Sequence, residues 1–343
     1  MIGAIFPGDR TVQLLDFPDP TPGPGEVVLE MKASGMCGSD LKAYRGTANT
    51  VFKRTGPTIA GHEPCGVVVE VGSGVDPSCA KVGDRMMVHH YKGCGACAEC
   101  FSGWAQLCNN LSESYGNNAH GGHATYLKVP ASTLVQLPEG LSYEVGAAIS
   151  CGSGTAWGAL KRIELSGSDT LLVVGQGPVG LAVTQFGVAM GARVIVLDIQ
   201  NSRLDQARAF GAETGVNTQS QDALEAVLAL TGGKGASKVV ETSGTAVGTL
   251  DAVRCAGKWG SVAFVGMGAS VNLDVTRQII VKQLTLKGSW TFSKSWQAEC
   301  ADFVVKRQIA VDRLFTHRWS LQQADEAYRL FDTQTTGKAV ICM

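Results

Sequence analysis

The sequence predicts an α/β protein of two domains, one β-rich and one built on a doubly wound parallel sheet. Its 343 residues exceed what one ordinary hydrophobic core organises. Short apolar runs between Gly, Pro and Asp turns fill the first 150 residues, whereas residues from about 168 to 290 alternate strand and helix patterns. We therefore expect residues 1–152 and 290–343 to form the β-rich domain and residues 153–289 the parallel-sheet domain.

The predicted strands of the first domain are short and lie between turns. Its apolar runs are VVLEMKA, GVVVEVG, RMMVHHY and ATYLKVP, and its turn segments include PDPTPGPGE and GSGVDPS. The C-terminal tail adds a helix pattern, ADEAYRLFDTQ, and a strand pattern, KAVICM. We expect this tail to fold back onto the N-terminal domain.

The second domain reads as six strands with intervening helices, which favours a doubly wound parallel sheet. Strand-like runs include LLVV, RVIVLD, KVVET, SVAFVG, TRQIIVKQ and LTLKGSW, and helix-like runs include PVGLAVTQFGVAM, ALEAVLALTGG and VGTLDAVRCAG. A further helix is expected after Ser202, with Asp205 as a capping-box variant and Gly211 at its end.

Composition excludes several functional classes. Hydrophobic residues make up 45% of the chain and charged residues 17%, as in soluble globular proteins. A net charge of −1 argues against binding to nucleic acid or to an anionic membrane. Residues 171–192 carry no charge, but their glycines, proline and glutamines favour a strand, a tight turn and a buried helix over a membrane span. The first residues, MIGAIFPGDR, lack the pattern of a signal peptide.

Eleven cysteines are many for such a chain, and four of them lie between Cys94 and Cys108. A secreted disulfide scaffold would be shorter and would scatter its cysteines. We therefore expect a reducing, cytoplasmic setting in which thiolates bind zinc. The cysteines outside any motif are interpreted as core or surface thiols; they are Cys65, Cys79, Cys255, Cys300 and Cys342.

A glycine-rich turn predicts a dinucleotide site. The motif G-x-G-x-x-G follows the strand LLVV, opens a helix, and is followed by a second strand that ends in an acid. Glycines at these positions permit the tight turn and the close approach of a pyrophosphate, which the helix N-terminus then attracts. The candidate cofactor-binding residues of the turn are Gly175, Gly177, Pro178, Val179 and Gly180.

Asp198, at the end of RVIVLD, indicates NAD as the cofactor. A carboxylate there accepts hydrogen bonds from the ribose hydroxyls and repels the 2′-phosphate of NADP. The alternative is a solvated acid at a strand end. Arg203 is compatible with three roles: contact with the adenosine ribose, tolerance of a 2′-phosphate, or a plain position in the first turn of a helix.

The most specific pattern is a run of four cysteines, Cys94, Cys97, Cys100 and Cys108. Four thiolates at this spacing enclose one ion in a closed tetrahedral shell, which is typical of a structural zinc site. The alternative is a run of free or redox-active thiols. A second, scattered set consists of Cys37 in CGSD, His62 in GHE and Cys151 in SCGSGT. Two thiolates and one imidazole leave a fourth position open, as in catalytic zinc sites.

The order of these motifs resembles the zinc-dependent medium-chain alcohol and polyol dehydrogenases. The segments CGSD, GHE, the four-cysteine lobe, CGxxT and GxGxxG follow one another as in that family, and the resemblance covers essentially the whole chain. It implies a GroES-like fold for the β-rich domain, a Rossmann fold for the other, NAD as cofactor, and two zinc ions per chain. It also implies a homo-oligomer, most simply a tetramer.

The resemblance further implies roles for single residues. Cys37, His62 and Cys151 match the ligands of the catalytic zinc, and Glu63 matches an acid beside the metal that helps ligand exchange. The remaining matches are Asp40, which orients the ligand His62 through its ring N–H, Ser39, which takes the alcohol proton, and Thr155, beside the nicotinamide. In the family, zinc polarises the substrate oxygen while hydride passes to the nicotinamide.

Two departures from the family pattern bear on the substrate. Lys42 stands where many relatives have a histidine that passes the proton outward, and His90 stands where many have an aromatic pocket wall. With Ser39 and Tyr44, these side chains predict a polar pocket. We therefore expect a secondary alcohol with a second polar group, such as a diol, a polyol or a hydroxy-ketone. The alternative is that Lys42 and Tyr44 are solvated loop residues.

Three other functions compete with this interpretation. The tail FTHRWSLQQADEAY also resembles threonine dehydrogenases, which act on an amino alcohol. A zinc-ribbon nucleic-acid module would need surplus Lys and Arg, yet residues 93–111 contain no basic residue. Zinc-free enoyl or quinone reductases keep the glycine turn but lack the ligand set found here. We expect small-molecule substrates only, with no nucleic-acid or membrane partner.

Overall fold

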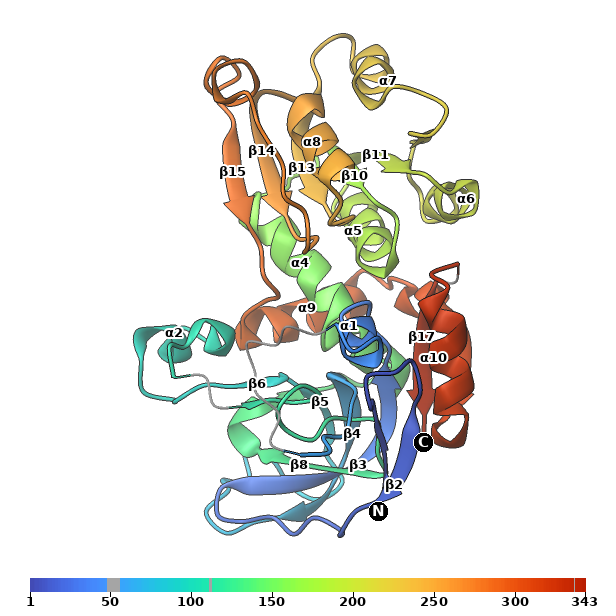
Figure 1. Cartoon of the computed structure of the whole chain (residues 1–343). Helices are drawn as coiled ribbons and strands as arrows, with labels where there is room; N and C mark the ends of the chain where they lie inside the picture. Colours follow the sequence, from blue (N-terminus) through green and yellow to red (C-terminus); the bar gives the residue numbers. More distant parts are fainter. Residues whose placement is uncertain (48–55, 111–112, 336) are drawn as a thin grey trace. The chain divides into compact units, whose positions relative to one another are not determined.

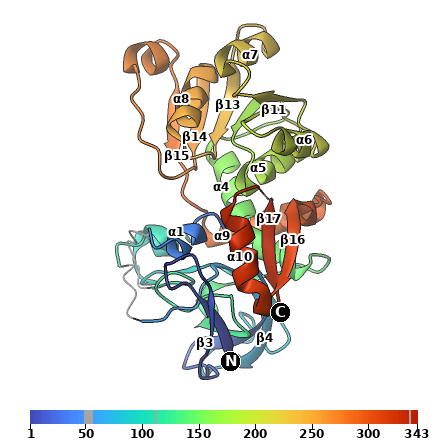
Figure 2. The same ribbon diagram turned by 45° about the vertical axis from the view of Figure 1, so that its right-hand side comes forward.

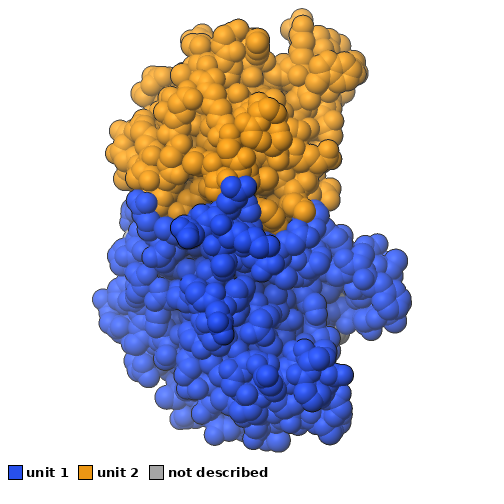
Figure 3. Space-filling model, turned by 180° about the vertical axis from the view of Figure 1, so that it is seen from behind, with its two compact units in different colours: residues 1–151, 293–343 blue, residues 152–292 orange. Residues whose placement is uncertain are grey.

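The computed structural model describes residues 1–47, 56–110, 113–335 and 337–343. The chain forms two compact units, Met1–Cys151 with Ser293–Met343 and Gly152–Phe292, which Figure 3 colours separately. The expected boundaries at 152 and 290 lie one and three residues away from these limits. Among the helices of the described residues, none has the length and hydropathy needed to cross a bilayer.

The first unit is β-rich, as its alternating apolar runs predicted (Figure 1). Its strands are β1 (Ile2–Ile5), β2 (Gln13–Asp16), β3 (Glu26–Gly35), β4 (Glu63–Val71), β5 (Arg85–Val88), β6 (Tyr91–Lys92), β7 (Glu113–Ser114), β8 (Tyr126–Pro130), β9 (Leu134–Gln136), β16 (Phe315–Ser320) and β17 (Lys338–Cys342). Its α-helices are α1 (Asp40–Tyr44), α2 (Ala98–Phe101), α3 (Tyr143–Ile149), α9 (Lys294–Lys306) and α10 (Ala324–Asp332). Single 3-10 turns cover Ala105–Leu107, Ala131–Thr133, Val311–Leu314 and Leu321–Gln323.

Seven strands form the main sheet of this unit in the order β16-β17-β3-β4-β5-β9, with β8 also paired to β3. The C-terminal strand β17 pairs antiparallel with β3, so the tail of the chain returns to the N-terminal sheet. Figure 2 shows α10 beside β16 and β17. One apolar core lies between α1, α10 and β17 and includes Phe6, Tyr44 and Tyr328.

The second unit is the predicted parallel sheet, in the order β12-β11-β10-β13-β14-β15. Its strands are β10 (Thr170–Val174), β11 (Arg193–Asp198), β12 (Thr214–Asn217), β13 (Ala236–Glu241), β14 (Ala256–Phe264) and β15 (Thr285–Gly288). Its helices are α4 (Gly152–Arg162), α5 (Pro178–Ala189), α6 (Asn201–Ala209), α7 (Ala223–Leu230), α8 (Ala246–Cys255) and one π-helical stretch (Val275–Ile280). The strand order reverses beside β10, which is where doubly wound sheets bind nucleotides.

The expected start of α6 was wrong. Ser202 does not cap this helix, because it lies inside α6, whose N-cap position is Gln200. The Gln200 N–H donates to Asp198 Oδ1 at 2.9 Å, and this local turn starts the helix two residues early. Asp205 instead pairs with Arg208 at 2.7 Å.

Candidate active site

Three ends of secondary structure bring the scattered ligand set together. Cys37 follows β3, His62 immediately precedes β4, and Cys151 follows α3. Gly35 at the end of β3 pairs with Glu63 at the start of β4, so antiparallel pairing alone brings two of the segments side by side. The ligand atoms of Cys37, His62, Glu63 and Cys151 all lie within 4.8 Å of one another.

Asp40 fixes the orientation of His62. The His62 Nδ1–H donates to Asp40 Oδ1 at 2.9 Å, which leaves Nε2 facing the cysteines. The Cys37 N–H donates to Asp40 Oδ2 at 2.9 Å. Burial raises the pKa of Asp40, but the neighbouring His62 and these hydrogen bonds outweigh it and hold the pKa at about 2. Asp40 is therefore a carboxylate placed as the resemblance implied.

The electrostatics of the cluster favour a cation. The hydrogen bond from Cys151 lowers the pKa of Cys37 well below its usual value, and the same bond raises the pKa of Cys151. Burial lowers the pKa of His62, but Asp40 and Cys37 more than reverse this and raise it. A thiolate and a carboxylate thus surround one imidazole in a buried place. Two sulfurs and one imidazole nitrogen are donors that suit zinc, so the residues present fit that ion.

Glu63 lies within this cluster, and its carboxylate forms an ion pair with Lys338. Its Oε2 lies 2.5 Å from Lys338 Nζ, and the two side chains are 0% and 2% exposed. Burial raises the pKa of Glu63 to about 7, although Lys338 acts to lower it. A Cβ on Gly35 would come within 1.8 Å of Glu63 Oε2, so a glycine at position 35 makes room for this carboxylate. Glu63 is therefore within reach of a metal while it is tied to Lys338.

The hydroxyl of Ser39 lies at the ligand atoms. Its Oγ is 3.3 Å from both Cys37 Sγ and His62 Nε2, and the residue is exposed. A hydroxyl in this position can accept a proton from a substrate oxygen and release it to solvent. The role proposed for Ser39 by resemblance is compatible with this geometry.

The structure separates the substrate-pocket candidates. His90 lies beside the cluster, with its ring centroid 5.1 Å from that of His62, whereas the Lys42 side chain is exposed. Tyr44 was wrongly expected in the pocket. It is 1% exposed and packs in the apolar core, 5.6 Å from the ring of Tyr328. The reason is local: α1 is a single turn whose Leu41 and Tyr44 face the core.

Burial keeps His90 neutral and gives it a defined hydrogen-bonding direction. Burial and the nearby His62 lower the pKa of His90 well below its usual value. Its Nδ1 lies 3.0 Å from the Ser150 carbonyl oxygen, which can only accept, so Nδ1 carries the proton. His90 Nε2 is therefore an acceptor of hydrogen bonds.

The four-cysteine lobe forms a second cluster. The sulfurs of Cys94, Cys97, Cys100 and Cys108 lie within 4.8 Å of one another, around α2. Backbone N–H groups donate to them: Ala96 to Cys94 Sγ at 3.4 Å, and Cys94 and Asn110 to Cys108 Sγ at 3.4 and 3.3 Å. These bonds stabilise thiolates; the Ala96 N–H is the largest cause that lowers the pKa of Cys94 to about 6.

The lobe is attached to the first unit through α9. Trp104 packs edge-on against Trp296 at 5.0 Å between ring centroids, and the Lys294 N–H donates to the Gly103 carbonyl at 2.9 Å. None of the eleven cysteines, all of which lie in the described residues, forms a disulfide; Cys65, Cys255 and Cys300 are buried, Cys342 is half-buried and Cys79 is exposed. The lobe therefore offers an all-thiolate shell, which fits a closed structural zinc site.

The glycine turn of the second unit is shaped for a phosphate. Gly175 has φ of +87°, and a Cβ on Gly180 would come within 1.9 Å of the Gly175 carbonyl oxygen. Gly177 is the N-cap of α5 and has no side-chain cap, Pro178 follows at N1, and Val179 and Gly180 complete the first turn. The free N–H groups of α5 and its positive end are thus available to an anion.

Asp198 lies beside the same turn, at the end of β11. Its Oδ2 accepts the Gln176 N–H at 2.6 Å, and it is 7% exposed. Arg203 NH1 lies 3.9 Å from Asp198 Oδ2, so the arginine is at the acid rather than on the far side of its helix. Thr155 lies in α4, 7% exposed, and its place beside a nicotinamide stays a prediction.

Several positioning residues were missing from the sequence analysis. Gln176 is buried in the glycine turn, where it accepts from Thr184 Oγ1 at 2.9 Å and donates to the Gly175 carbonyl at 3.1 Å. Lys338 holds Glu63, and Tyr328 donates to Asp40 Oδ2 at 3.1 Å. The middle position of G-x-G accepts many residue types and so gives no signal for Gln176, whereas Lys338 and Tyr328 give none because their partners are distant in sequence.

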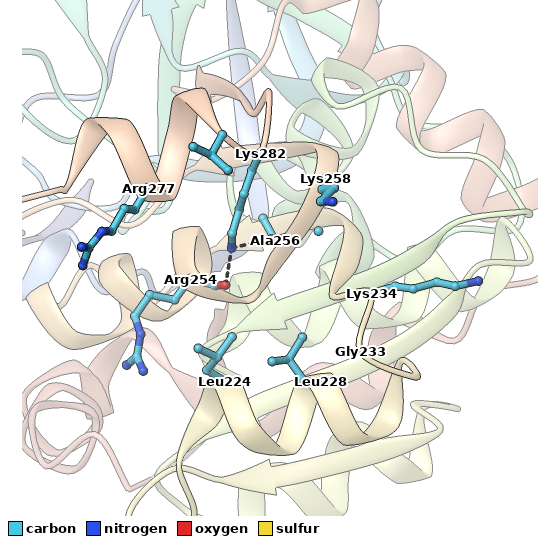
Figure 4. Close-up of a pocket in the computed structure, with 11 residues that line it drawn as sticks. Leu224, Leu228, Gly233, Lys234, Arg254, Ala256, Lys258, Arg277 and Lys282 are labelled. Carbon is cyan, nitrogen blue, oxygen red and sulfur yellow. Dashed lines mark hydrogen bonds between the residues drawn. The ribbon is translucent and has the colours of Figure 1, made fainter.

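A separate cavity of about 670 Å³ lies in the second unit (Figure 4). Lys234 precedes β13, Ala256 opens β14 and Lys282 precedes β15, so the cavity lies at the amino ends of these strands. Nucleotides bind at the carboxyl ends of such sheets. At the C-terminal end of α8, Lys282 Nζ donates to the carbonyl oxygens of Arg254 and Ala256 at 2.7 and 2.9 Å. The cavity is therefore distinct from the glycine turn.

Known proteins share these features. The family described as zinc-binding dehydrogenase matches residues 178–306, and the alcohol dehydrogenase GroES-like domain matches residues 23–139. The zinc-type alcohol dehydrogenase-like protein YphC of Escherichia coli K12 is 38% identical over 99% of this chain and 98% of its own length. Sorbitol dehydrogenase of Halalkalibacterium halodurans is 30% identical over 94% of this chain and 93% of its own length.

A solved structure shows the same fold around a cofactor. The rspB alcohol dehydrogenase of Escherichia coli CFT073, complexed with NADH, is 27% identical to this chain and superposes with a TM-score of 0.90. The alignment covers 100% of this chain and 99% of that protein. The GroES-like and parallel-sheet fold predicted from the sequence is thereby confirmed. With this fold, the two cysteine clusters and the glycine turn, the chain belongs to the zinc-dependent medium-chain alcohol dehydrogenase family.

Proposed function

We propose that this oxidoreductase uses NAD and a catalytic zinc to interconvert a secondary alcohol and its ketone, with a diol, polyol or hydroxy-ketone as substrate. The observation that carries the proposal is the three-ligand set of Cys37, His62 and Cys151 with the Ser39 hydroxyl 3.3 Å from two of its ligand atoms. A closed site would need a fourth fixed ligand, whereas Glu63 is tied to Lys338. The set thus leaves a position for substrate.

The residues divide the chemistry among them. When bound, zinc supplies a Lewis acid that lowers the pKa of a substrate hydroxyl, and NAD supplies the hydride acceptor. Ser39 Oγ takes the hydroxyl proton and passes it to solvent. Asp40 keeps the His62 ring aimed at the metal. The turn from Gly175 to Gly180 binds the pyrophosphate, and Asp198 accepts the ribose hydroxyls.

The second polar group of the substrate is proposed to meet His90. Its Nε2 is a buried acceptor beside His62, and it pairs with a hydroxyl that a simple alcohol lacks. An unpaired buried acceptor penalises the simple alcohol by about 1–3 kcal/mol, or about 5- to 150-fold in kcat/KM. The sorbitol dehydrogenase relative acts on a polyol by its name, which agrees with this class.

The test compares a vicinal diol with the mono-alcohol of equal length, with NAD as cofactor. We expect higher kcat/KM for the diol, and loss of that preference in His90→Phe. Equal or better turnover of the mono-alcohol contradicts the polar pocket. Threonine belongs in the same panel because the tail of the chain also resembles threonine dehydrogenases; a strong preference for it favours the amino-alcohol alternative.

Two further properties are proposed on the family resemblance. We expect a homotetramer, which light scattering at working concentration measures directly; a monomer contradicts it.

We also expect a reducing, cytoplasmic location, in keeping with eleven cysteines that form no disulfide. Detection of the native protein in the cytoplasmic fraction of its source cells tests the location.

A further inference from the structure

Behind the zinc-ligand set lies a buried hydrogen-bonded chain that joins distant parts of the first unit. His123 Nε2 lies 2.7 Å from the Tyr328 hydroxyl, and this hydroxyl lies 3.1 Å from Asp40 Oδ2. Asp40 Oδ1 in turn accepts from His62 Nδ1 at 2.9 Å. His123 and Tyr328 are 0% exposed, and Asp40 and His62 are 5% exposed. This series of hydrogen bonds therefore runs from His123 through Tyr328 of α10 to His62, among residues that are at most 5% exposed.

The direction of each hydrogen bond follows from the donors available. A carboxylate only accepts, so the Tyr328 O–H donates to Asp40. The hydroxyl has one proton, so its remaining bond must be accepted, and His123 Nε2–H is the donor. His123 Nδ1 is buried without a hydrogen-bond partner, which fits a neutral imidazole with a bare lone pair there. All protons of the chain thus point toward Asp40 and away from His123.

Asp40 needs this support because its own helix is short. The helix α1 has five residues and no side-chain cap, so one turn of backbone holds the carboxylate. Asp40 Oδ2 receives two bonds, one from the Cys37 N–H and one from Tyr328. The ring of Tyr328 is itself fixed by Phe6 and Tyr44, at 4.7 and 5.6 Å between centroids.

We propose that Tyr328 and His123 are positioning residues for the catalytic zinc: their relay locks Asp40 and thereby presets the His62 ring for the metal. The proposal rests on the catalytic zinc of the proposed function. Groups that orient metal ligands from behind change metal affinity by about 10- to 100-fold when they are removed. Tyr328 acts through Asp40 and touches neither metal nor substrate.

The experiment measures zinc affinity rather than turnover. The full-length protein is dialysed against a chelator until only the lobe ion remains, and zinc is then titrated against a chromophoric competitor. We expect Tyr328→Phe to raise the zinc dissociation constant of the Cys37 site about tenfold or more, which means weaker binding. In the same variant, the visible spectrum of cobalt(II) bound at this site shifts, because the imidazole ligand is no longer held in one orientation.

Tyr115→Phe is the matched control. Tyr115 is 2% exposed and donates to the Glu113 carboxylate at 3.1 Å, so the substitution removes a tyrosine hydroxyl from another carboxylate of the same unit. We expect zinc affinity within about twofold of the natural chain, since Asp40 is untouched. An equal loss in Tyr115→Phe assigns the effect to general loosening and overturns the relay.

His123 provides an independent arm that does not depend on how well Tyr328→Phe folds. His123→Leu removes the donor and weakens zinc binding, whereas His123→Gln keeps an N–H in that place and restores it. In the Tyr328→Phe background His123→Leu adds no further loss of zinc affinity, because both act through one hydroxyl. Additive losses, or unchanged affinity in Tyr328→Phe, overturn the proposal. A natural chain that binds only the lobe ion overturns the proposed catalytic zinc itself.

Discussion

At the scale of single residues, Gly35 leaves space for the Glu63 carboxylate beside the candidate metal ligands because it has no side chain. Its backbone is ordinary β-strand, so a larger residue meets no conformational strain there. A Cβ would nevertheless lie 1.8 Å from Glu63 Oε2, inside the ion pair with Lys338. Both the carboxylate and the lysine are buried, so neither can swing into solvent.

We predict that Gly35→Ala weakens zinc binding at the Cys37 site and destabilises the fold by about 1–3 kcal/mol, the usual range for overpacking. Gly38→Ala is the control, because a Cβ there has nothing within 4 Å. Zinc titration and urea denaturation measure the two effects. Identical zinc affinity in Gly35→Ala and Gly38→Ala contradicts the steric argument.

We expect Asp198 to determine the choice between NAD and NADP through its charge. It already accepts N–H groups of Gln176 and Gln200, so its carboxylate is held in place before any nucleotide arrives. Arg203 is the cation nearest to it at 3.9 Å among the described ion pairs. Removal of the acid leaves that arginine free to meet a 2′-phosphate.

We predict that Asp198→Ser lowers the ratio of kcat/KM for NAD to that for NADP by about tenfold or more. Asp205→Ser, on the exposed face of α6, the helix that follows Asp198, is the control and keeps the natural ratio. Steady-state assays with both cofactors give the ratio. A natural enzyme with equal kcat/KM for both cofactors already contradicts the role given to Asp198.

At the scale of elements, substitution of a cysteine in the four-cysteine lobe and of one in the catalytic set should have different effects: the first on stability, the second on turnover. The lobe is made of one short helix, α2, and turns, and its contact with α9 rests on Trp104, Trp296 and Lys294. It has little apolar core of its own, so we expect a zinc ion bound there to contribute folding energy. The Cys37 site instead stands on β3, β4 and α3, which pack without it.

We predict that Cys97→Ser lowers the unfolding temperature by about 4 °C or more, whereas Cys37→Ser abolishes turnover and changes the temperature by less than about 2 °C. Differential scanning calorimetry and elemental analysis check both, with two zinc ions per natural chain and one in either variant. Equal thermal losses in the two variants mean that the two sites share one structural role.

Prediction from sequence succeeded where one local pattern determined an element. The glycine turn and the four-cysteine run lie within short segments, and the structure gathers their members as expected. β12 was missed because TGVN has a single large apolar residue, whereas the run TRQIIVKQ, expected as a strand, forms a π-helical stretch and a turn. The helix start at Asn201 depends on the hydrogen bond that the Gln200 N–H donates to Asp198. A strand with one large apolar residue and a helix start set by one hydrogen bond are harder to predict than elements with clear apolar periodicity.

The supporting residues of the site escaped prediction for a different reason. Tyr328 and Asp40 are 288 residues apart, and Lys338 reaches Glu63 only because β17 returns to pair with β3. In the sequence, Tyr328 sits on the apolar face of a helix and looks like an ordinary core residue. Tyr44 gave the opposite error: a tyrosine near a ligand motif was expected in the pocket and belongs to the core.

At the scale of the whole molecule, buried histidines make stability depend on pH. Burial lowers the pKa of His89 and of His123 to about 4, and it lowers the pKa of His90 well below its usual value. Each binds a proton near pH 6.5 once the chain unfolds. Below that pH the unfolded state therefore holds more protons, and stability falls as pH falls from about 6.5 toward 4. Glu63 opposes this, because its pKa of about 7 lets the folded state hold one proton more.

We predict that the zinc-free protein loses stability as the pH falls from 6.5 to 5, because His89, His90 and His123 take up protons in the unfolded state and Glu63 offsets only one of them. Asp40 adds nothing in this window, because its stabilising effect is lost only between about pH 3.8 and pH 2. Urea denaturation at several pH values gives the slope, and His89→Gln reduces it by about one proton, which is about 1.4 kcal/mol per pH unit. Zinc-free protein is used because metal loss in acid would add its own slope through the cysteines and His62. A slope that His89→Gln leaves unchanged means that His89 is already protonated in the folded chain, and a flat profile contradicts the neutral histidine core on which the His123 tautomer depends.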